Sequence, residues 1–268
     1  MFDRYNRRIS YLRISVTDRC NLRCIYCMPP RGVLLHPRDG ILSYEEIVRI
    51  VEEAARLGIS KIRLTGGEPL VRKNIDHLIL YLKNIKGVKE VALTTNGVLL
   101  SKMAVDLRQA GLDRINISLD TLDPEKYRTL TGSSDLDKVL EGIEATLKAG
   151  FKNTKLNMVL IPDINLGCVE KMEEFCREKG LLFQRINHYF LNELLTTQQN
   201  YEAERPLPCE QCNRIRLTAD GKLKPCLFSD REYPVDLKDI TSSLQEAIIN
   251  KPEHGMRCTV RGNWEIGG

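Results

Sequence analysis

The 268-residue sequence lacks an apolar run long enough to cross a membrane, and residues 1–8 are polar and charged. It also lacks a strong charge of either sign, because 40 Lys and Arg stand against 36 Asp and Glu, a net charge of +4. Without such a run a membrane span is not expected, and the polar residues 1–8 argue against a secretory signal. We therefore expect a soluble, cytoplasmic chain. A net charge this small does not require nucleic acid as a partner. A basic pocket for a small anion would give the same small excess of positive charge.

Cysteine is abundant, with nine residues, an odd number that does not suit a set of disulfides. Cys20, Cys24 and Cys27 are spaced C-x3-C-x2-C directly after the strand-like residues 11–16. Structural zinc takes four ligands in a closed tetrahedron, whereas an iron–sulfur cubane held by three cysteines leaves one iron open. With the aromatic Tyr26 before the third cysteine, the motif resembles that of the radical S-adenosylmethionine (SAM) enzymes and predicts a 4Fe-4S cluster.

A second group of three cysteines lies near the C-terminus. Cys209 and Cys212 are three residues apart, and Cys226 follows. This group also predicts an open cluster. Cys168 and Cys176 lie in a helical-looking stretch, where a free cysteine usually packs as a small buried hydrophobe.

Short strand-like runs alternate with helical patterns along most of the chain. The expected strands are residues 11–16, 61–65, 90–94, 113–118, 153–160 and 182–186. A typical helix is residues 44–57, which begins at the capping-box pair Ser43 and Glu46. Six βα units in succession predict an α/β fold with a six-stranded parallel, TIM-like partial (β/α)6 barrel, whose ligands bind at the carboxyl ends of the strands.

Residues 193–208 are rich in Thr, Gln, Asn, Glu and Pro, which indicates a loop or linker. We therefore predict a partial-barrel domain over residues 1–192 and a C-terminal segment over residues 193–268. This segment is too small to fold on a hydrophobic core alone, so the second cluster would organise it.

Five motifs together resemble one family. They are LRISVTDRC at 12–20, KIRLTGGEP at 61–69, NISLDTL at 116–122, CNRIRLT at 212–218 and the terminal Gly267 and Gly268. The chain is similar to the GTP 3′,8-cyclases, radical SAM lyases that open molybdenum cofactor biosynthesis. The resemblance implies two 4Fe-4S clusters, SAM as cofactor, and conversion of GTP to (8S)-3′,8-cyclo-7,8-dihydroguanosine 5′-triphosphate. It also implies an electron donor such as a flavodoxin or ferredoxin, and a possible homodimer.

The resemblance assigns site residues as well. The cofactor-binding residues are Tyr26, Gly66, Gly67, Glu68 and Ser118. The GTP-binding residues are Arg13, Lys61, Arg63, Thr94, Lys155, Arg214 and Arg216. The catalytic residues are the first three cysteines with Arg214, Arg216, Gly267 and Gly268. Physical chemistry supports the cations, since a charge within a strand is costly to bury unless it meets an anion.

The sequence departs from the family at Gln184, Asn187 and Tyr189, where an arginine, a glutamate and a methionine are usual. The linker before Cys209 and the segment after Cys226 are also short for the family. Two alternatives therefore stay open: a diverged radical SAM paralogue that acts on a peptide or another small molecule, and a non-catalytic electron-transfer or scaffold protein.

Overall fold

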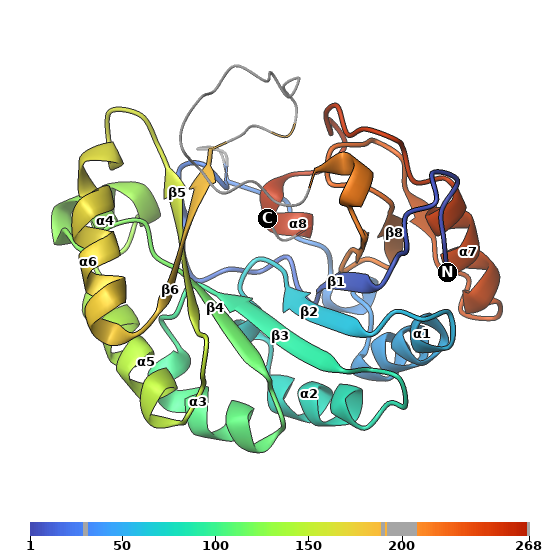
Figure 1. The fold of residues 1–268 in the computed structure, drawn as a ribbon, viewed down its shortest axis with the longest axis horizontal. Coiled ribbons are helices and arrows are strands. Elements are labelled where there is room, and N and C mark those ends of the chain that lie inside the picture. The colour runs from blue at the N-terminus through green and yellow to red at the C-terminus, as the bar shows by residue number, and fades with distance from the viewer. Residues whose placement is uncertain (29–31, 189–190, 192–207, 267–268) are drawn as a thin grey trace.

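The computed structural model describes residues 1–28, 32–188, 191 and 208–266. Strands and helices alternate through its first part (Figure 1). The strands are β1 (Tyr11–Ser15), β2 (Lys61–Thr65), β3 (Glu90–Thr95), β4 (Arg114–Ser118), β5 (Lys155–Leu160) and β6 (Leu182–Asn187). The helices are α1 (Tyr44–Arg56), α2 (Ile75–Lys83), α3 (Leu100–Gln109), α4 (Pro124–Thr131), α5 (Leu136–Lys148) and α6 (Val169–Lys179). The predicted βα succession is confirmed.

The C-terminal part adds three strands and two helices. These elements are β7 (Arg214–Leu217), β8 (Lys222–Lys224), β9 (Tyr233–Pro234), α7 (Ile240–Ile249) and α8 (Asn263–Ile266). Four short 3₁₀ turns complete the description: η1 (Arg38–Gly40), η2 (Pro69–Val71), η3 (Leu166–Cys168) and η4 (Cys209–Gln211).

All nine strands form one sheet in the order β6-β5-β4-β3-β2-β1-β7-β8-β9. The pairs from β6 to β7 are parallel, and β8 and β9 are antiparallel. Figure 1 shows this sheet as an open arc with α1, α2, α3, α5 and α6 along its outer side and α8 on the inner side. The predicted partial barrel is confirmed. The predicted boundary between residues 192 and 193 lies outside the described residues, and the segment that follows joins the sheet through β7 and β1.

Local sequence signals explain where the elements begin and end. The predicted capping box is confirmed, because the Ser43 hydroxyl accepts from Glu46 N at 3.1 Å and Ser43 N donates to the Glu46 carboxylate at 2.7 Å. The strand predicted from residue 153 begins at Lys155 instead. Asn153 has φ of 57°, a left-handed conformation that cannot continue a strand.

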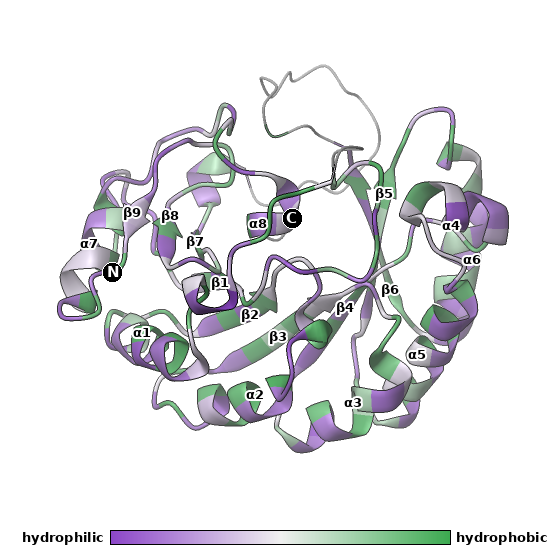
Figure 2. Ribbon diagram, turned by 180° about the vertical axis from the view of Figure 1, so that it is seen from behind, coloured by the Kyte–Doolittle hydropathy of each residue, from purple (hydrophilic) through white to green (hydrophobic). Residues whose placement is uncertain are grey.

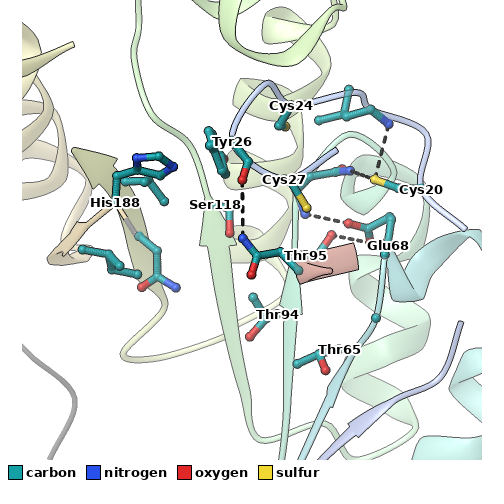
Figure 3. Close-up of a pocket in the computed structure, with 18 of the residues that line it drawn as sticks. Cys20, Cys24, Tyr26, Cys27, Thr65, Glu68, Thr94, Thr95, Ser118 and His188 are labelled. Atoms are coloured by element: carbon teal, nitrogen blue, oxygen red, sulfur yellow. Dashed lines mark hydrogen bonds between the residues drawn. The ribbon is translucent and has the colours of Figure 1, made fainter. Parts of the chain in front are cut away.

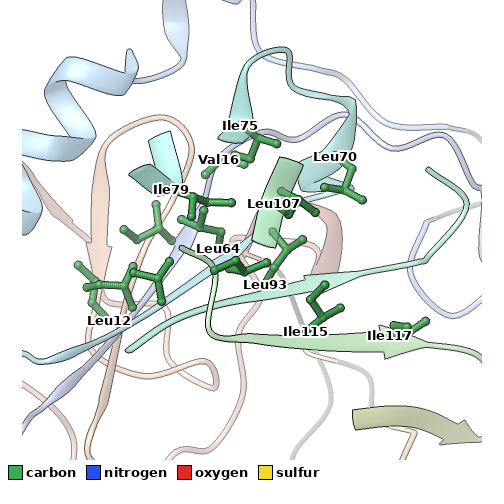
Figure 4. Close-up of a cluster of buried hydrophobic side chains, with 14 of the residues drawn as sticks. Leu12, Val16, Leu64, Leu70, Ile75, Ile79, Leu93, Leu107, Ile115 and Ile117 are labelled. Carbon is green, nitrogen blue, oxygen red and sulfur yellow. The ribbon is translucent and has the colours of Figure 1, made fainter. Parts of the chain in front are cut away.

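The hydrophobic core lies between the sheet and its outer helices. Figure 4 shows strand residues such as Leu12, Leu64 and Leu93 packed with Ile79 and Leu107 from α2 and α3. In Figure 2 hydrophilic and hydrophobic residues alternate along these helices, as expected where one helix face covers a sheet. Because side chains alternate along a strand, neighbours of the core residues point to the inner side of the arc, where the polar residues gather.

The predicted packing of two cysteines is confirmed. Cys168, just before α6, and Cys176, within it, are both buried. Among the described helices none has the length and apolar character needed to cross a membrane.

Helices α3 and α5 meet at a glycine. A Cβ placed on Gly142 of α5 would lie 2.5 Å from the Gly97 carbonyl oxygen and 2.9 Å from Leu100 Cβ. Backbone cannot move aside as a flexible side chain can, so the contact requires glycine although glycine disfavours a helix.

We predict that Gly142→Ala lowers the free energy of unfolding. Overpacking costs about 1–3 kcal/mol, and the higher helix propensity of alanine offsets up to about 1 kcal/mol of this loss. Urea unfolding followed by circular dichroism measures the change. Gly167→Ala is the matched control, because a Cβ there meets no atom within 4 Å. A Gly142→Ala chain as stable as the control would contradict the proposed contact.

Candidate functional site

The three cysteines after β1 line one cavity at the carboxyl ends of the parallel strands (Figure 3). The cavity is lined by Cys20, Leu22, Cys24, Tyr26, Cys27, Thr65, Gly66, Gly67, Glu68, Thr94, Thr95, Asn96, Ser118, Asn157, Val159, Ile186, Asn187, His188 and Asn263. The structure therefore brings together the first cysteine group, every residue predicted to bind the cofactor, and Thr94. In Figure 3, His188 lies across the cavity from Cys20 and Glu68.

The three thiols are partly buried, and at Cys20 the effect of burial on the pKa outweighs that of the nearby Arg23. Burial raises the pKa of Cys27 to about 12, and burial together with Asp120 and the other two thiols raises the pKa of Cys24 well above its usual value. Burial also raises the pKa of Cys20. Thiolates here would need positive charge from a bound group, which the irons of a cluster supply.

Among the described residues, no three His, Cys, Asp or Glu side chains converge on one metal-ion position. A cubane does not require such convergence, because each cysteine binds a different iron. The three cysteines therefore fit the predicted cluster.

Two glycines bring the loop after β2 against the cysteine loop. A Cβ on Gly66 would lie 2.4 Å from the Thr17 carbonyl oxygen, and one on Gly67 would lie 2.4 Å from the Arg19 carbonyl oxygen. Gly67 N donates to Thr17 O at 2.7 Å, and Glu68 N donates to Arg19 O at 2.8 Å. Both glycines line the cavity, but their first requirement is close contact with the protein's own backbone.

Glu68 joins the loops after β2 and β3. Its buried carboxylate accepts from Leu70 N at 3.0 Å, Thr95 Oγ1 at 2.8 Å and Asn96 N at 2.7 Å. Burial raises the pKa of Glu68 to about 7, while these donors favour the ionised form. The Asn96 side chain, held in this way, donates to Asn21 Oδ1 at 2.8 Å, within the cysteine loop.

Tyr26 is fixed by Asp120, which follows a predicted strand at the edge where ligand groups are expected. The Tyr26 hydroxyl donates to Asp120 Oδ2 at 2.7 Å, and Val159 N donates to Asp120 Oδ1 at 2.7 Å. Burial raises the pKa of Asp120 to about 6. The position of Asp120 two residues after Ser118, at a strand end, was the available signal, but a single acid there has many possible roles.

Three arginines form a row across neighbouring strands. Arg13 of β1 pairs in register with Arg63 of β2 and with Arg216 of β7, so all three point to the inner side. Burial and the nearby arginines, Arg216 first, lower the pKa of Arg13 to about 9. Arg63 Nη1 donates to Thr94 Oγ1 at 3.3 Å. Such repulsion between cations is relieved by a bound anion.

The other predicted cations have different surroundings. Lys61 is half exposed, and its ammonium lies 3.6 Å from Glu90 Oε2. Lys155 is partly buried on β5, on the same face as the cavity residue Asn157. The Arg214 guanidinium lies 5.6 Å from the centre of the Tyr11 ring.

The second cysteine group lies at the opposite ends of the strands from the first. Cys212 comes just before β7, which runs parallel to β1, and Cys226 comes just after β8, which runs antiparallel to β7. Cys209 belongs to η4. The arginine row therefore lies between the two groups, since Arg13 and Arg216 are in the middle of their strands.

Helix α8 closes one side of the cavity, which the sequence did not predict. Asn263 lines the cavity and donates to Tyr26 O at 3.4 Å, and the Ile266 carbonyl accepts from Arg216 Nη1 at 3.1 Å. The predicted catalytic residues Gly267 and Gly268 follow directly but lie outside the described residues, as does Tyr189.

The remaining family departures lie on β6. Asn187 lines the cavity, and Gln184 pairs in register with the cavity residue Asn157.

Arg261 holds the segment that leads into α8. Its guanidinium, only 6% exposed, lies 2.7 Å from Asp220, 2.8 Å from Glu232 and 2.9 Å from Glu265. Burial opposes the charge, but these carboxylates raise the pKa of Arg261 above its usual value. The ion cluster ties the α8 segment to the β7–β8 turn.

Comparison with known proteins gives two family matches. The Radical SAM superfamily model matches residues 14–176, and the Molybdenum Cofactor Synthesis C model matches residues 202–254.

Curated relatives match along nearly the whole chain. A protein of Clostridium botulinum (strain Langeland) named GTP 3′,8-cyclase is 38% identical over 96% of this chain and 95% of its own. Proteins of the same name are 42% identical in Thermodesulfovibrio yellowstonii, over 93% of this chain and 92% of the relative, and 40% identical in Alkaliphilus oremlandii over both full chains. The last alignment spans 322 positions, so that relative carries internal residues that this 268-residue chain lacks.

Two solved structures share the fold. Streptococcus suis SuiB bound to S-adenosylmethionine has a TM-score of 0.70 at 17% identity and covers 94% of this chain and 66% of its own. Native anSMEcpe with bound AdoMet has a TM-score of 0.70 at 18% identity and covers 91% of this chain and 81% of its own. At such identities the likeness shows the fold alone.

We predict that Arg261→Met lowers the free energy of unfolding by about 3 kcal/mol near neutral pH, because it leaves buried carboxylates without their partner. Although burial opposes it, Arg261 lowers the pKa of Asp220 and Glu232 below their ordinary values of 3.8 and 4.5. A carboxyl group whose pKa is lowered in the folded state stabilises the fold at a pH above its ordinary pKa. It loses this effect as the pH falls through the lowered pKa. The difference from wild type should therefore shrink below about pH 4.

Urea unfolding across a pH series measures this difference. Lys222→Met is the matched control, because the Lys222 ammonium lies 3.6 Å from the same two carboxylates on a side chain that is 40% exposed. We expect it to cost at most about 1 kcal/mol. A difference for Arg261→Met that stayed constant down to pH 3 would rule out the ion cluster as its cause.

Proposed function

Because the chain belongs to the GTP 3′,8-cyclase family of the radical SAM superfamily, we propose that it converts GTP to (8S)-3′,8-cyclo-7,8-dihydroguanosine 5′-triphosphate. This is the first step of molybdenum cofactor biosynthesis. The observation that supports it most is the row of three arginines between two groups of three cysteines. An anionic nucleotide on that row would have one cysteine group on either side.

The first group would hold a 4Fe-4S cluster, with SAM at its open iron. When bound, the cluster and SAM supply the one-electron radical chemistry of the superfamily. The chain's own residues surround that reaction. Gly66 and Gly67 would present backbone to the methionine part of SAM. Tyr26, oriented by Asp120, and Ser118 would border its adenosyl part.

The arginine row would bind the triphosphate. Guanidinium groups present planar pairs of donors that match phosphate oxygens, and Arg13, Arg63 and Arg216 are aligned by strand register rather than by flexible loops. Thr94, fixed by Arg63, adds a hydroxyl. Lys61, Lys155 and Arg214 remain proposed GTP contacts.

Cys209, Cys212 and Cys226 would hold the second 4Fe-4S cluster, which would meet the guanine base. All three are half-buried free thiols, and two flank the inner strands β7 and β8. Three thiols leave one position open, which suits a cluster that binds a substrate atom.

In the proposed reaction the ribose C3′ of GTP loses a hydrogen atom to the radical that SAM cleavage would supply, and C3′ then bonds to C8 of guanine in the same nucleotide. One electron and one proton then complete the dihydroguanine ring, and a flavodoxin or ferredoxin would supply the electron. Holding one nucleotide in a folded conformation makes the bond formation intramolecular, which can lower the barrier by roughly 7–11 kcal/mol. A homodimer and a cytoplasmic location remain proposals.

Gly267 and Gly268 would complete the site. They follow Ile266, whose carbonyl accepts from Arg216, so the described part of the chain ends at the arginine row. Two glycines without side chains can enter a narrow space beside a ligand.

The test of this function is anaerobic incubation of the reconstituted protein with SAM, a reductant and GTP, followed by product analysis. We expect Cys24→Ala to abolish SAM cleavage, whereas Cys212→Ala should retain some uncoupled cleavage and form no cyclised product. Only the first cluster must reduce SAM, and the second would position the base. Wild-type product formation by Cys212→Ala, or SAM cleavage without any GTP product in the wild type, would sink the proposal.

A second prediction separates the arginine row from the lysine beside it. Arg216→Ala should lower the rate of cyclisation at least ~10²-fold, about 2.7 kcal/mol, with iron content unchanged. Lys61→Ala should have a smaller effect, because Lys61 is half exposed and has Glu90 as a neighbour. Product analysis under saturating SAM makes the comparison, and equal losses in the two variants would contradict the role given to the row.

A further inference from the structure

Lys251 lies buried beside the second cysteine group. The residue comes just after α7 and is only 3% exposed. The ammonium donates to Arg214 O at 2.8 Å and to Pro225 O at 2.7 Å, and its charge acts on the Cys212 thiol. An ammonium has three N–H donors, and these two carbonyls take two of them. The two carbonyls belong to the segments that carry Cys212 and Cys226, so Lys251 ties the two segments together.

Arg7 makes the corresponding connection for the third cysteine. It is 6% exposed, and its Nε lies 2.6 Å from Asp3 Oδ2. Nη1 donates to Cys209 O at 2.9 Å and to Glu253 O at 2.9 Å, and Nη2 donates to Pro252 O at 2.7 Å. Arg7 thus joins the Cys209 turn to the residues that directly follow Lys251.

The same short segment also contacts the last cysteine. A Cβ on Gly255 would lie 2.8 Å from Cys226 Sγ, so glycine is required for the sulfur to sit there. Residues 251–255 therefore touch the segments of all three cysteines. They position the group through two buried cations rather than through an apolar core.

The Lys251 ammonium brings a positive charge to the second group. It acts on both Cys212 and Cys226, because it donates to the carbonyls of Arg214 and Pro225 in their segments. A cation beside the ligating sulfurs stabilises the more negative, reduced state of a cluster.

We propose that Lys251 and Arg7 are positioning residues for the second cluster, and that the charge of Lys251 raises the reduction potential of that cluster. This inference rests on the second cluster of the proposed function. With this buried cation beside it, the second cluster accepts an electron more readily than it would without it.

The experiment isolates the second site in the full-length chain with Cys20→Ala, Cys24→Ala and Cys27→Ala as parent. After anaerobic reconstitution the parent should hold about four irons by cubane stoichiometry. Adding Lys251→Met should speed iron loss to a chelator about 10-fold or more, the usual effect of losing an outer partner of a metal ligand. The midpoint potential of the remaining cluster should also fall in the Lys251→Met chain, and spectroelectrochemistry measures it. Lys238→Met, which removes an exposed lysine before α7, is the matched control.

Each outcome decides between the hypotheses. A parent chain that binds no iron would overturn the second cluster of the proposed function and this inference with it. A parent that binds four irons, with Lys251→Met unchanged in iron loss and potential, would overturn the inference alone. In the chain with all nine cysteines, Lys251→Met should keep the first cluster and its SAM cleavage. Loss of both clusters together would show a general folding role and overturn the specific one.

Arg7→Met gives an independent check, because the Arg7 charge is paired with Asp3 and reaches the Cys209 turn through a carbonyl. We expect faster iron loss in the same parent with a smaller change in potential. An equal fall in potential for both variants would contradict the charge of Lys251 as its specific cause.

Discussion

The pairing of β1 with β2 on one side and with β7 on the other is the constraint on which the rest of the site depends. The carboxyl ends of parallel strands share one edge, so this pairing places the first cysteines beside the loop after β2. The same registers align Arg13 with Arg63 and Arg216 at the middle of the sheet. Since β7 is parallel to β1, the second cysteine group falls at the opposite edge. The C-terminal segment is thus part of the sheet.

The distribution of charge follows from this geometry. The interior side of the sheet carries the row of arginines, whereas the first cysteine cavity contains thiols whose pKa is raised and buried acids such as Glu68 and Asp120. The cationic part of the polar interior and the part lined by thiols and acids are therefore separated in space. This separation suits the proposed placement of a nucleotide between the two cysteine groups.

Much of the fold was predictable, because the signals were local. Five of the six predicted strands are within one residue of those in the structure, and the helix after Ser43 begins where its capping box predicts. Strand alternation and helix caps depend on neighbours in sequence, which a pattern can reveal. The strand that began late did so because Asn153 adopts a left-handed conformation, and a chain pattern does not report a backbone angle.

The sequence by itself determined the three-cysteine motifs, the glycine turn after β2 and the presence of cations in strands, since these chemical identities are read directly. Only the tertiary structure decided which of them meet. It aligned Arg216 with Arg13, separated Lys61 from that row, and placed Asn263 of α8 on the wall of a cavity more than two hundred residues from its cysteines. It also placed Lys251 between Cys212 and Cys226. Such contacts arise from register and packing between distant segments, and no spacing within one segment encodes them.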